Sequence, residues 1–138
     1  MKIMALDLGD SRIGIAMSDG MGIIANGYET YNRQKNDSDY TYICNLAKQN
    51  NVGEIVIGLP INMDGSEGER VVSAREFGAK IAQMLPNIPI KYMDERLTTV
   101  SAERVLLEAD ISREKRKKVI DKIAATIILQ AYLDTIKR

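Results

Sequence analysis

Three aspartates stand in sequence that is otherwise apolar. Asp7 lies near the end of the apolar segment 3–8, Asp94 directly follows the segment 88–93, and Asp121 precedes a helical repeat of Ala, Ile and Leu. The chain contains no histidine, so acid–base or metal chemistry would have to use carboxylates. Carboxylate oxygens favour a hard cation such as Mg²⁺, with Mn²⁺ as an alternative, rather than Zn²⁺.

Each of these acids also has an ordinary structural explanation. Asp7 precedes Gly9, and Asp and Gly commonly end strands. Asp94 could pair with Arg96 in a simple salt bridge. A lone acid on a helix face, such as Asp121, is usually a satisfied structural residue, although three acids from distant segments make coincidence a weaker explanation.

Asp121 is the most unusual of the three acids. Its neighbours at helical spacing are all small or apolar: Ala124, Ala125, Ile128 and Leu129. The carboxylate therefore projects from the face that should pack on a sheet, and the alanines allow close backbone approach. Because an unpaired buried charge costs several kcal/mol, Asp121 needs a cation, a side-chain partner or a pocket open to water.

Composition bounds the remaining possibilities. A chain of 138 residues fits one domain, residues 1–138, and its 19 basic and 19 acidic residues cancel. Any electrostatic partner must therefore be bound through a local patch. The one cysteine, Cys44, rules out an internal disulfide and is expected to be a buried, unreactive thiol. No segment has the length of a signal peptide or a membrane span, so we expect a cytoplasmic protein.

The periodicity of the apolar residues predicts alternating strands and helices. Segments 2–8, 12–18 and 23–31 read as three strands joined by tight turns, which should form an antiparallel meander. The later elements, in order, are a helix capped within 37–39, a strand at 53–60, a helix begun by a capping box of Ser66 and Glu69, a strand at 88–93, a helix at about 100–109 and a helix capped by Ser112.

This order favours an α/β fold with a mixed five-stranded sheet and helices on both faces. That is the layout of the ribonuclease H-like fold, although periodicity alone supports only the three-layer α/β class. If the first, fourth and fifth strands run parallel, their ends lie near one another. Asp7 and Asp94 would then meet at one edge of the sheet.

The segment 58–68 is rich in glycine and polar residues and joins a strand to a helix. Backbone N–H groups at such a helix N-terminus can hold a phosphate. The segment is not a Walker loop, because no Gly-Lys-Ser/Thr follows. The alternative is an ordinary flexible connection with a capped helix.

A basic cluster precedes Asp121 in the sequence. It consists of Arg113, Lys115, Arg116, Lys117, Lys118 and Lys122. Such a run is usually a solvated helix face. Positive side chains beside an acidic metal site would also suit a nuclease, because they hold the polyanion while the acids carry the ions.

Four segments, taken in order along the chain, resemble the signature segments of the YqgF family, also called RuvX. The segments are Met4-Ala5-Leu6-Asp7-Leu8-Gly9 with Arg12-Ile13-Gly14, Gly58-Leu59-Pro60 through Asp64-Gly65-Ser66, Asp94-Glu95-Arg96-Leu97-Thr98-Thr99, and Arg116-Lys117-Lys118 through Asp121 to Ala124-Ala125. The match spans nearly the whole chain. It implies a ribonuclease H-like nuclease of the bacterial cytoplasm, linked to maturation of small-subunit ribosomal RNA and formerly to Holliday junction resolution.

The resemblance also implies roles for particular residues. Asp7, Asp94 and Asp121 match the family's catalytic acids by position, and Glu95 either assists or replaces Asp94. We expect these aspartates to bind two Mg²⁺ ions that assist phosphodiester hydrolysis. Residues expected to contact the nucleic acid are Arg12, Arg116, Lys117, Lys118 and Ser66.

Other functions remain open from the sequence. The substrate could be precursor RNA or branched DNA, and the protein could act as a monomer or as a homodimer. A non-catalytic ribosome-assembly factor would use the fold and the basic helix only to hold RNA. An actin-like phosphotransferase also uses Asp-x-Gly after a first strand, but that class normally needs two such domains.

Overall fold

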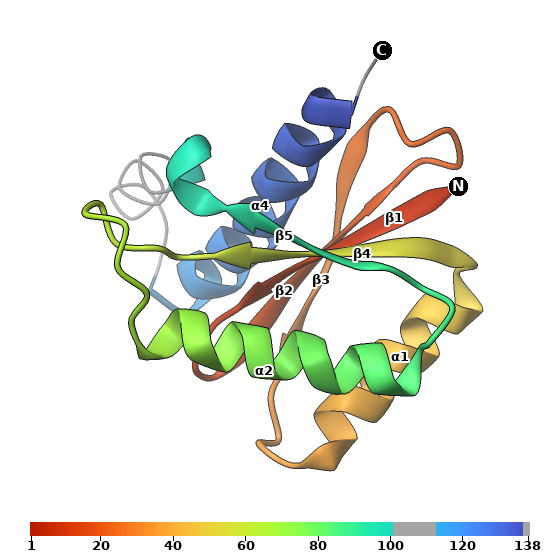
Figure 1. Cartoon of the computed structure of the whole chain (residues 1–138), viewed down its shortest axis with the longest axis horizontal. Helices are drawn as coiled ribbons and strands as arrows, with labels where there is room; N and C mark the ends of the chain where they lie inside the picture. Colours follow the sequence, from red (N-terminus) through yellow and green to blue (C-terminus); the bar gives the residue numbers. More distant parts are fainter. Residues whose placement is uncertain (101–112, 137–138) are drawn as a thin grey trace.

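Five strands form one mixed sheet between two helical layers (Figure 1). The computed structural model describes residues 1–100 and 113–136, the side chains of residues 113–118 excepted. Its elements are β1 (Lys2–Leu8), β2 (Arg12–Ser18), β3 (Ala25–Asn32), α1 (Asp37–Gln49), β4 (Val52–Leu59), α2 (Glu69–Met84), β5 (Ile90–Asp94), a 3₁₀ turn η1 (Glu95–Leu97) and α4 (Arg113–Ile136). Among these helices none is both long and apolar enough to cross a membrane.

The strand order is β3-β2-β1-β4-β5. β1, β2 and β3 pair antiparallel, which confirms the predicted meander, whereas β4 runs parallel to both β1 and β5. The carboxyl ends of β1, β4 and β5 therefore meet at one edge of the sheet, hereafter the carboxyl edge. Asp7 and Asp94 both lie at this edge.

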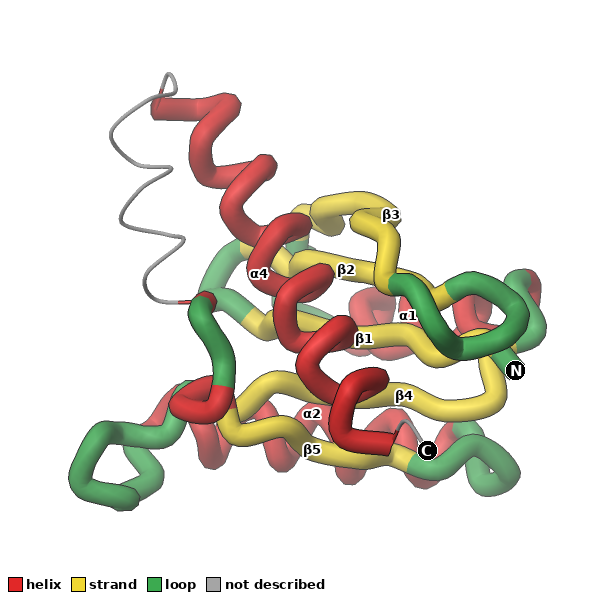
Figure 2. Tube along the Cα trace, turned by 90° about the horizontal axis from the view of Figure 1, so that it is seen from above, coloured by secondary structure: helices red, strands yellow, loops and turns green. Residues whose placement is uncertain are grey.

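Helices cover both faces, as the sequence predicts. Figure 2 shows α4 crossing one face of the sheet, with α1 and α2 on the other. Side chains of β1 alternate between the layers: Met4 and Leu6 join the core under α1 and α2, whereas Ile3 and Ala5 join the core under α4. All four are fully or almost fully buried. Cys44 is also buried as predicted, and burial raises the pKa of its thiol.

Some predicted boundaries were wrong by one or two residues. β3 begins at Ala25 rather than Ile23, and β5 begins at Ile90 rather than Ile88. Ile23 and Ile24 are instead bound through their N–H groups to the carboxylate of Asp19, which closes the turn before β3. The helix predicted at 100–109 and the cap predicted at Ser112 lie outside the described residues, apart from Val100.

The predicted capping of two helices was also wrong. Asn36, rather than a residue of 37–39, caps α1, because its side chain accepts the N–H of Ser38. α2 has Gly68 at its N-cap and no side-chain cap, so Ser66 and Glu69 form no capping box. The hydroxyl and N–H of Ser66 both donate to Asp64, so they are already used inside the loop.

Candidate functional site

Asp7 is buried inside the layer between the sheet and α4. It follows Ile3 and Ala5 on the same face of β1, and only 3% of its surface is exposed. Its register partner on β2 is Gly14. On the other side, Asp7 follows Leu6, whose register partner on β4 is Ile57, so Gly58 lies at the level of Asp7. A glycine therefore flanks Asp7 on each neighbouring strand.

Gly14 lets α4 approach the sheet closely at Asp121. A Cβ atom at Gly14 would lie 2.0 Å from the carbonyl oxygen of Asp121 and 2.5 Å from its carbonyl carbon. The helix backbone thus rests on β2 at the level of Asp7. The apolar face predicted beyond Asp121 is buried, since Ala125, Ile128 and Leu129 have no exposed surface.

Gly58 makes room for the side chain of Glu95. A Cβ atom at Gly58 would lie 3.0 Å from Oε2 of Glu95 and 2.5 Å from Cδ1 of Ile128 on α4. Glu95 therefore folds back from η1 over β4, on the same face of the sheet as Asp7. Glu95 is a partly buried residue, and its side chain belongs to the layer beneath α4.

The structure does not bring Asp94 to this face. Met93 packs in the core under α4, so alternation directs Asp94 to the opposite side, shared with Tyr92. Asp94 accepts the backbone N–H of Arg96 at 2.9 Å, and its Oδ2 binds Nη2 of Arg96 at 2.7 Å. These bonds from Arg96 hold the pKa of Asp94 below its usual value. Asp94 thus caps η1, the turn that carries Glu95.

The acids that share one face and one end of the sheet are consequently Asp7, Glu95 and Asp121. Their carboxylate oxygens are of the type that Mg²⁺ and Mn²⁺ prefer. Within residues 1–100 and the described part of α4, however, no three acidic, cysteine or histidine side chains are grouped closely enough to hold a metal ion. The donor chemistry therefore fits a divalent cation, while the arrangement shown is not a closed ligand set.

Arg12 binds one of these acids directly. Its Nε lies 2.8 Å from Oδ2 of Asp121, and the two side chains are 27% and 14% exposed. Arg12 is the first residue of β2, two positions before Gly14, so the ion pair joins the end of the strand to the helix that crosses it. Arg12, which was expected to contact nucleic acid, thus binds a carboxylate oxygen of Asp121, a candidate metal ligand.

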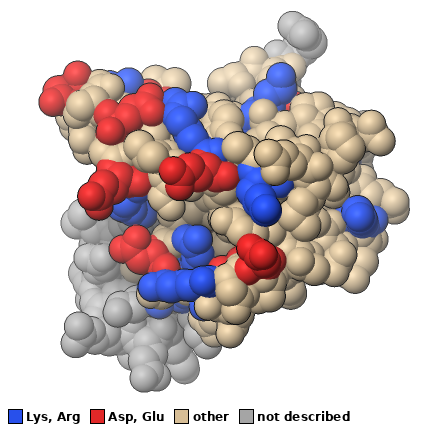
Figure 3. All heavy atoms as spheres, turned by 60° about the horizontal axis from the view of Figure 1, so that its bottom comes forward, with Lys and Arg blue, Asp and Glu red and all other residues tan. Residues whose placement is uncertain are grey.

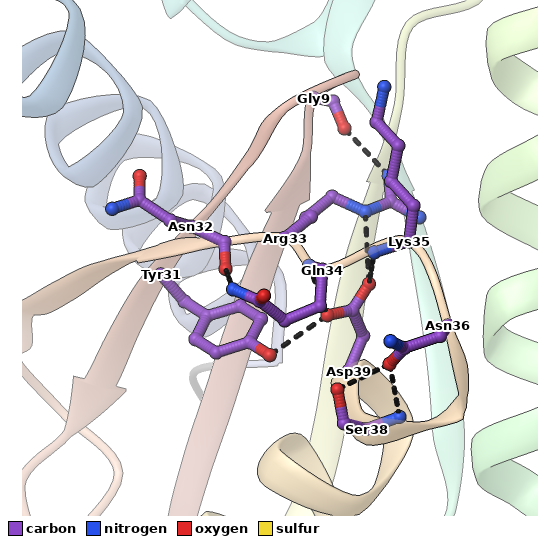
Figure 4. Close-up of polar contacts among 9 residues, drawn as sticks. All are labelled: Gly9, Tyr31, Asn32, Arg33, Gln34, Lys35, Asn36, Ser38 and Asp39. Atoms are coloured by element: carbon purple, nitrogen blue, oxygen red, sulfur yellow. Dashed lines mark hydrogen bonds and ion pairs between the residues drawn. The ribbon is translucent and has the colours of Figure 1, made fainter.

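A second arginine holds the turn between β1 and β2. Nη1 of Arg33 donates to the carbonyl oxygen of Gly9 at 2.7 Å (Figure 4). The backbone N–H of Arg33 donates to the carbonyl oxygen of Ser11 at 2.8 Å. Gly9 in turn donates to the carbonyl oxygen of Arg12 at 2.9 Å. Arg33 therefore fixes the short turn that connects Asp7 to Arg12.

Asp39, which is 2% exposed, supports Arg33 from α1. Its Oδ2 lies 3.8 Å from Nε of Arg33, while its oxygens accept the N–H groups of Gln34 and Lys35 and the hydroxyl of Tyr31 (Figure 4). Burial alone would raise the pKa of Asp39, but these hydrogen bonds outweigh it and lower the pKa. Sequence reasoning missed this network, because neither residue interrupts an apolar run.

The remaining predicted contacts are dispersed. Ser66 is exposed in the loop after β4, where it accepts a hydrogen bond from Asn62 at 3.0 Å. The backbone of Arg116, Lys117 and Lys118 forms the first turns of α4, before Asp121. On the face in Figure 3, the acidic and basic side chains that are coloured lie interleaved.

Solved structures with the same architecture were found by comparison. The fowlpox virus resolvase in complex with Holliday junction DNA matches with a TM-score of 0.64 at 10% identity, over 100% of both chains. RuvC of Thermus thermophilus in complex with a Holliday junction matches with a TM-score of 0.57 at 8% identity, over 98% of this chain and 95% of RuvC. The fold is therefore ribonuclease H-like, as the sequence predicts.

Closer relatives were found by sequence. A protein of Syntrophomonas wolfei, named "Putative pre-16S rRNA nuclease", is 51% identical over 134 residues, which are 97% of this chain and 94% of the relative. A protein of the same name from Halothermothrix orenii is 52% identical over 134 residues, or 97% and 95% of the two chains. The family model for RuvX, described as Holliday junction resolvase, matches residues 1–135. The chain therefore belongs to the RuvX family.

Proposed function

We propose that this protein is a metal-dependent nuclease that hydrolyses phosphodiester bonds in the precursor of small-subunit ribosomal RNA. The observation that carries the proposal is that Asp7, Glu95 and Asp121 lie on the same face of the sheet, at its carboxyl edge. The substrate follows from relatives at about half identity that are named for pre-16S rRNA cleavage.

Asp7, Glu95 and Asp121 would hold the catalytic cation, Mg²⁺ or Mn²⁺. When bound, such an ion supplies an activated water and stabilises charge on the leaving oxygen. This assignment keeps Asp7 and Asp121 as metal ligands and gives the third position to Glu95. Asp94 then acts as a positioning residue, because it caps the turn that presents Glu95.

Arg12 has two roles in this proposal. In the arrangement described, its guanidinium neutralises Asp121 within the layer beneath α4. If Asp121 held a cation instead, Arg12 would be free beside the same site to bind a phosphate oxygen of the substrate. Arg116, Lys117, Lys118 and Ser66 are proposed as further contacts to the backbone of the nucleic acid.

Holliday junction resolution is the second candidate function. It is favoured by the family description and by similarity in fold to two proteins solved with junction DNA. Symmetric cutting of a four-way junction would require a homodimer, whereas trimming of RNA needs only a monomer. Under either function the chain would work as one domain, residues 1–138, in the cytoplasm.

A cleavage assay with purified protein tests the proposal. End-labelled precursor RNA and a four-way DNA junction are incubated separately with Mg²⁺, with Mn²⁺ and with EDTA. We expect RNA cleavage with either ion and none with EDTA. An Asp7→Asn protein, purified in parallel, controls for contaminating nucleases and should bind RNA without cutting it.

The other outcomes separate the alternatives. Cleavage of the junction but not of RNA would favour the resolvase. RNA binding without cleavage under every condition would favour a non-catalytic assembly factor. Equal cleavage by the Asp7→Asn protein would remove Asp7 from the chemistry.

A further inference from the structure

A pocket of about 560 Å³ opens at the carboxyl edge of the sheet. Its lining comes from residues 60–63, which follow β4, and from Glu95, Arg96, Thr98 and Thr99, which follow β5. Both segments extend beyond the ends of the two strands in Figure 1. The register pair Leu59 and Asp94 ends these strands together, so the pocket lies between two neighbouring loops.

Glu95 connects this pocket to the candidate active site. Glu95 is one of the lining residues of the pocket, and its Oε2 lies against Gly58 beneath α4, at the level of Asp7. A nucleic acid that places a phosphate at Asp7 and Glu95 would therefore place an adjoining nucleoside at the pocket. The pocket is thus a candidate subsite for the substrate itself.

The charge of the lining disfavours a phosphate as the occupant. Arg96 is the only cation among the lining residues, all of which are described, and Asp94 binds it through both carboxylate oxygens. The hydrogen bond to Asp94 raises the pKa of Arg96, and the negative charge of Asp64 nearby raises it further. Glu95 is itself a lining residue and adds negative charge next to the pocket, so an uncharged group suits the pocket better than an anion does.

The shape and polarity of the lining favour a nucleobase. Pro60, Ile61 and Met63 contribute apolar groups, and Asn62 and the two threonines contribute hydrogen-bonding groups. Met63 is 88% exposed, and Leu97, the last residue of η1, is 73% exposed and lies in sequence between the lining residues Arg96 and Thr98. Exposed apolar side chains beside a polar pocket mark a binding surface, and methionine adapts to flat partners.

We propose that this pocket holds one unpaired nucleobase of the substrate, next to the phosphate that is cleaved. This inference rests on the proposed nuclease function and deepens it. The volume is in the range of small-ligand pockets, and a base still paired with its complement would bring a second strand against the loops. The protein would therefore select single-stranded or unpaired segments over continuous duplex.

The test is RNA binding by a Met63→Ser, Leu97→Ser double variant. Both side chains are exposed, so the variant should fold normally. Fluorescence anisotropy, measured in EDTA to prevent cleavage, gives Kd for a short single-stranded RNA and for the same RNA in a duplex. We expect Kd for the single strand to rise about fivefold to tenfold, with little change for the duplex.

Two controls sharpen this experiment. Met21→Ser removes a methionine that is 79% exposed in the turn before β3, away from the pocket, and should leave both Kd values unchanged. An abasic position is then moved along the single-stranded RNA. At one position the missing base should weaken binding to the parent protein, and there the double variant should cause no further loss.

The possible outcomes separate a failure of the pocket proposal from a failure of the proposed nuclease function. A parent protein that cleaves RNA, with a double variant that binds the single strand equally well, would overturn the pocket alone. Equal losses for single strand and duplex would also overturn it, because the loops would then contact only backbone. A parent protein that neither binds nor cleaves nucleic acid would contradict both the pocket and the proposed function.

Discussion

Glu95→Gln is expected to reduce cleavage by at least about 100-fold, whereas Asp94→Asn should retain most of the activity. The two acids are neighbours in sequence, yet Glu95 lies over Gly58 on the face of Asp7, and Asp94 is bound by Arg96 on the opposite face. When a carboxylate ligand is replaced by a neutral amide, the bound cation loses several kcal/mol of electrostatic stabilisation. The loss of charge at Asp94 weakens only an exposed pair and a cap.

Steady-state cleavage of precursor RNA by the two variants gives the comparison directly. Both substitutions keep the size of the side chain, so each variant serves as the control for the other. Thermal unfolding should show that Asp94→Asn lowers the free energy of unfolding by about 1 kcal/mol or less, because a partly exposed ion pair and one hydrogen bond are weakened. If Asp94→Asn abolished cleavage and Glu95→Gln did not, the assignment of the third acid would be reversed.

Gly14→Ala is expected to destabilise the fold by about 1–3 kcal/mol and to abolish most of the cleavage. The added Cβ would lie 2.0 Å from the carbonyl oxygen of Asp121, and this neighbour is helix backbone that cannot turn away. α4 must therefore move off β2, which carries the carboxylate of Asp121 away from the level of Asp7. Stability and catalysis should fall together.

Thermal unfolding and cleavage assays check this prediction. Gly20→Ala is the matched control, because a Cβ at Gly20 would have no neighbour within 4 Å. Unchanged unfolding and unchanged activity in the Gly14→Ala protein would contradict the close contact between α4 and β2. Normal activity in a destabilised variant would separate Asp121 from the chemistry.

Much of the fold follows from the periodicity of the chain. β1 and β2 match their predicted bounds, because every buried position in them is apolar or small except Asp7 and Ser18. The ends of β3 and β5 were less predictable. Ile23 and Ile24 continue an apolar pattern into β3 but are held by the carboxylate of Asp19, a local contact that periodicity does not encode.

The candidate site was only partly predictable from the residue types. Asp7 and Asp121 were identified because each is a charge on an apolar face, and both belong to the layer beneath α4. For the third acid, strand alternation was the available signal. Met93 faces α4, so the next side chain on that face comes from Glu95 after the chain turns at η1, rather than from Asp94.

The supporting contacts could not be predicted. The ion pair of Arg12 with Asp121 joins residues 109 positions apart, and no local pattern specifies such a partner. Gly14 and Gly58 were part of recognised motifs, but their role emerges only from the register that places both beside Asp7. Long-range packing against a glycine leaves no periodic trace in the sequence.

The most direct test of the shared cation site is a measurement of Mn²⁺ binding in the absence of nucleic acid. Electron paramagnetic resonance gives the concentration of free Mn²⁺ and hence the Kd. We predict that the parent protein binds Mn²⁺, that Asp7→Asn, Glu95→Gln and Asp121→Asn each weaken binding at least about tenfold, and that Asp94→Asn does not. Arg12→Gln should strengthen binding, because Arg12 competes for Asp121. Equal Mn²⁺ affinity in the parent protein and the three carboxylate variants would contradict the shared cation site.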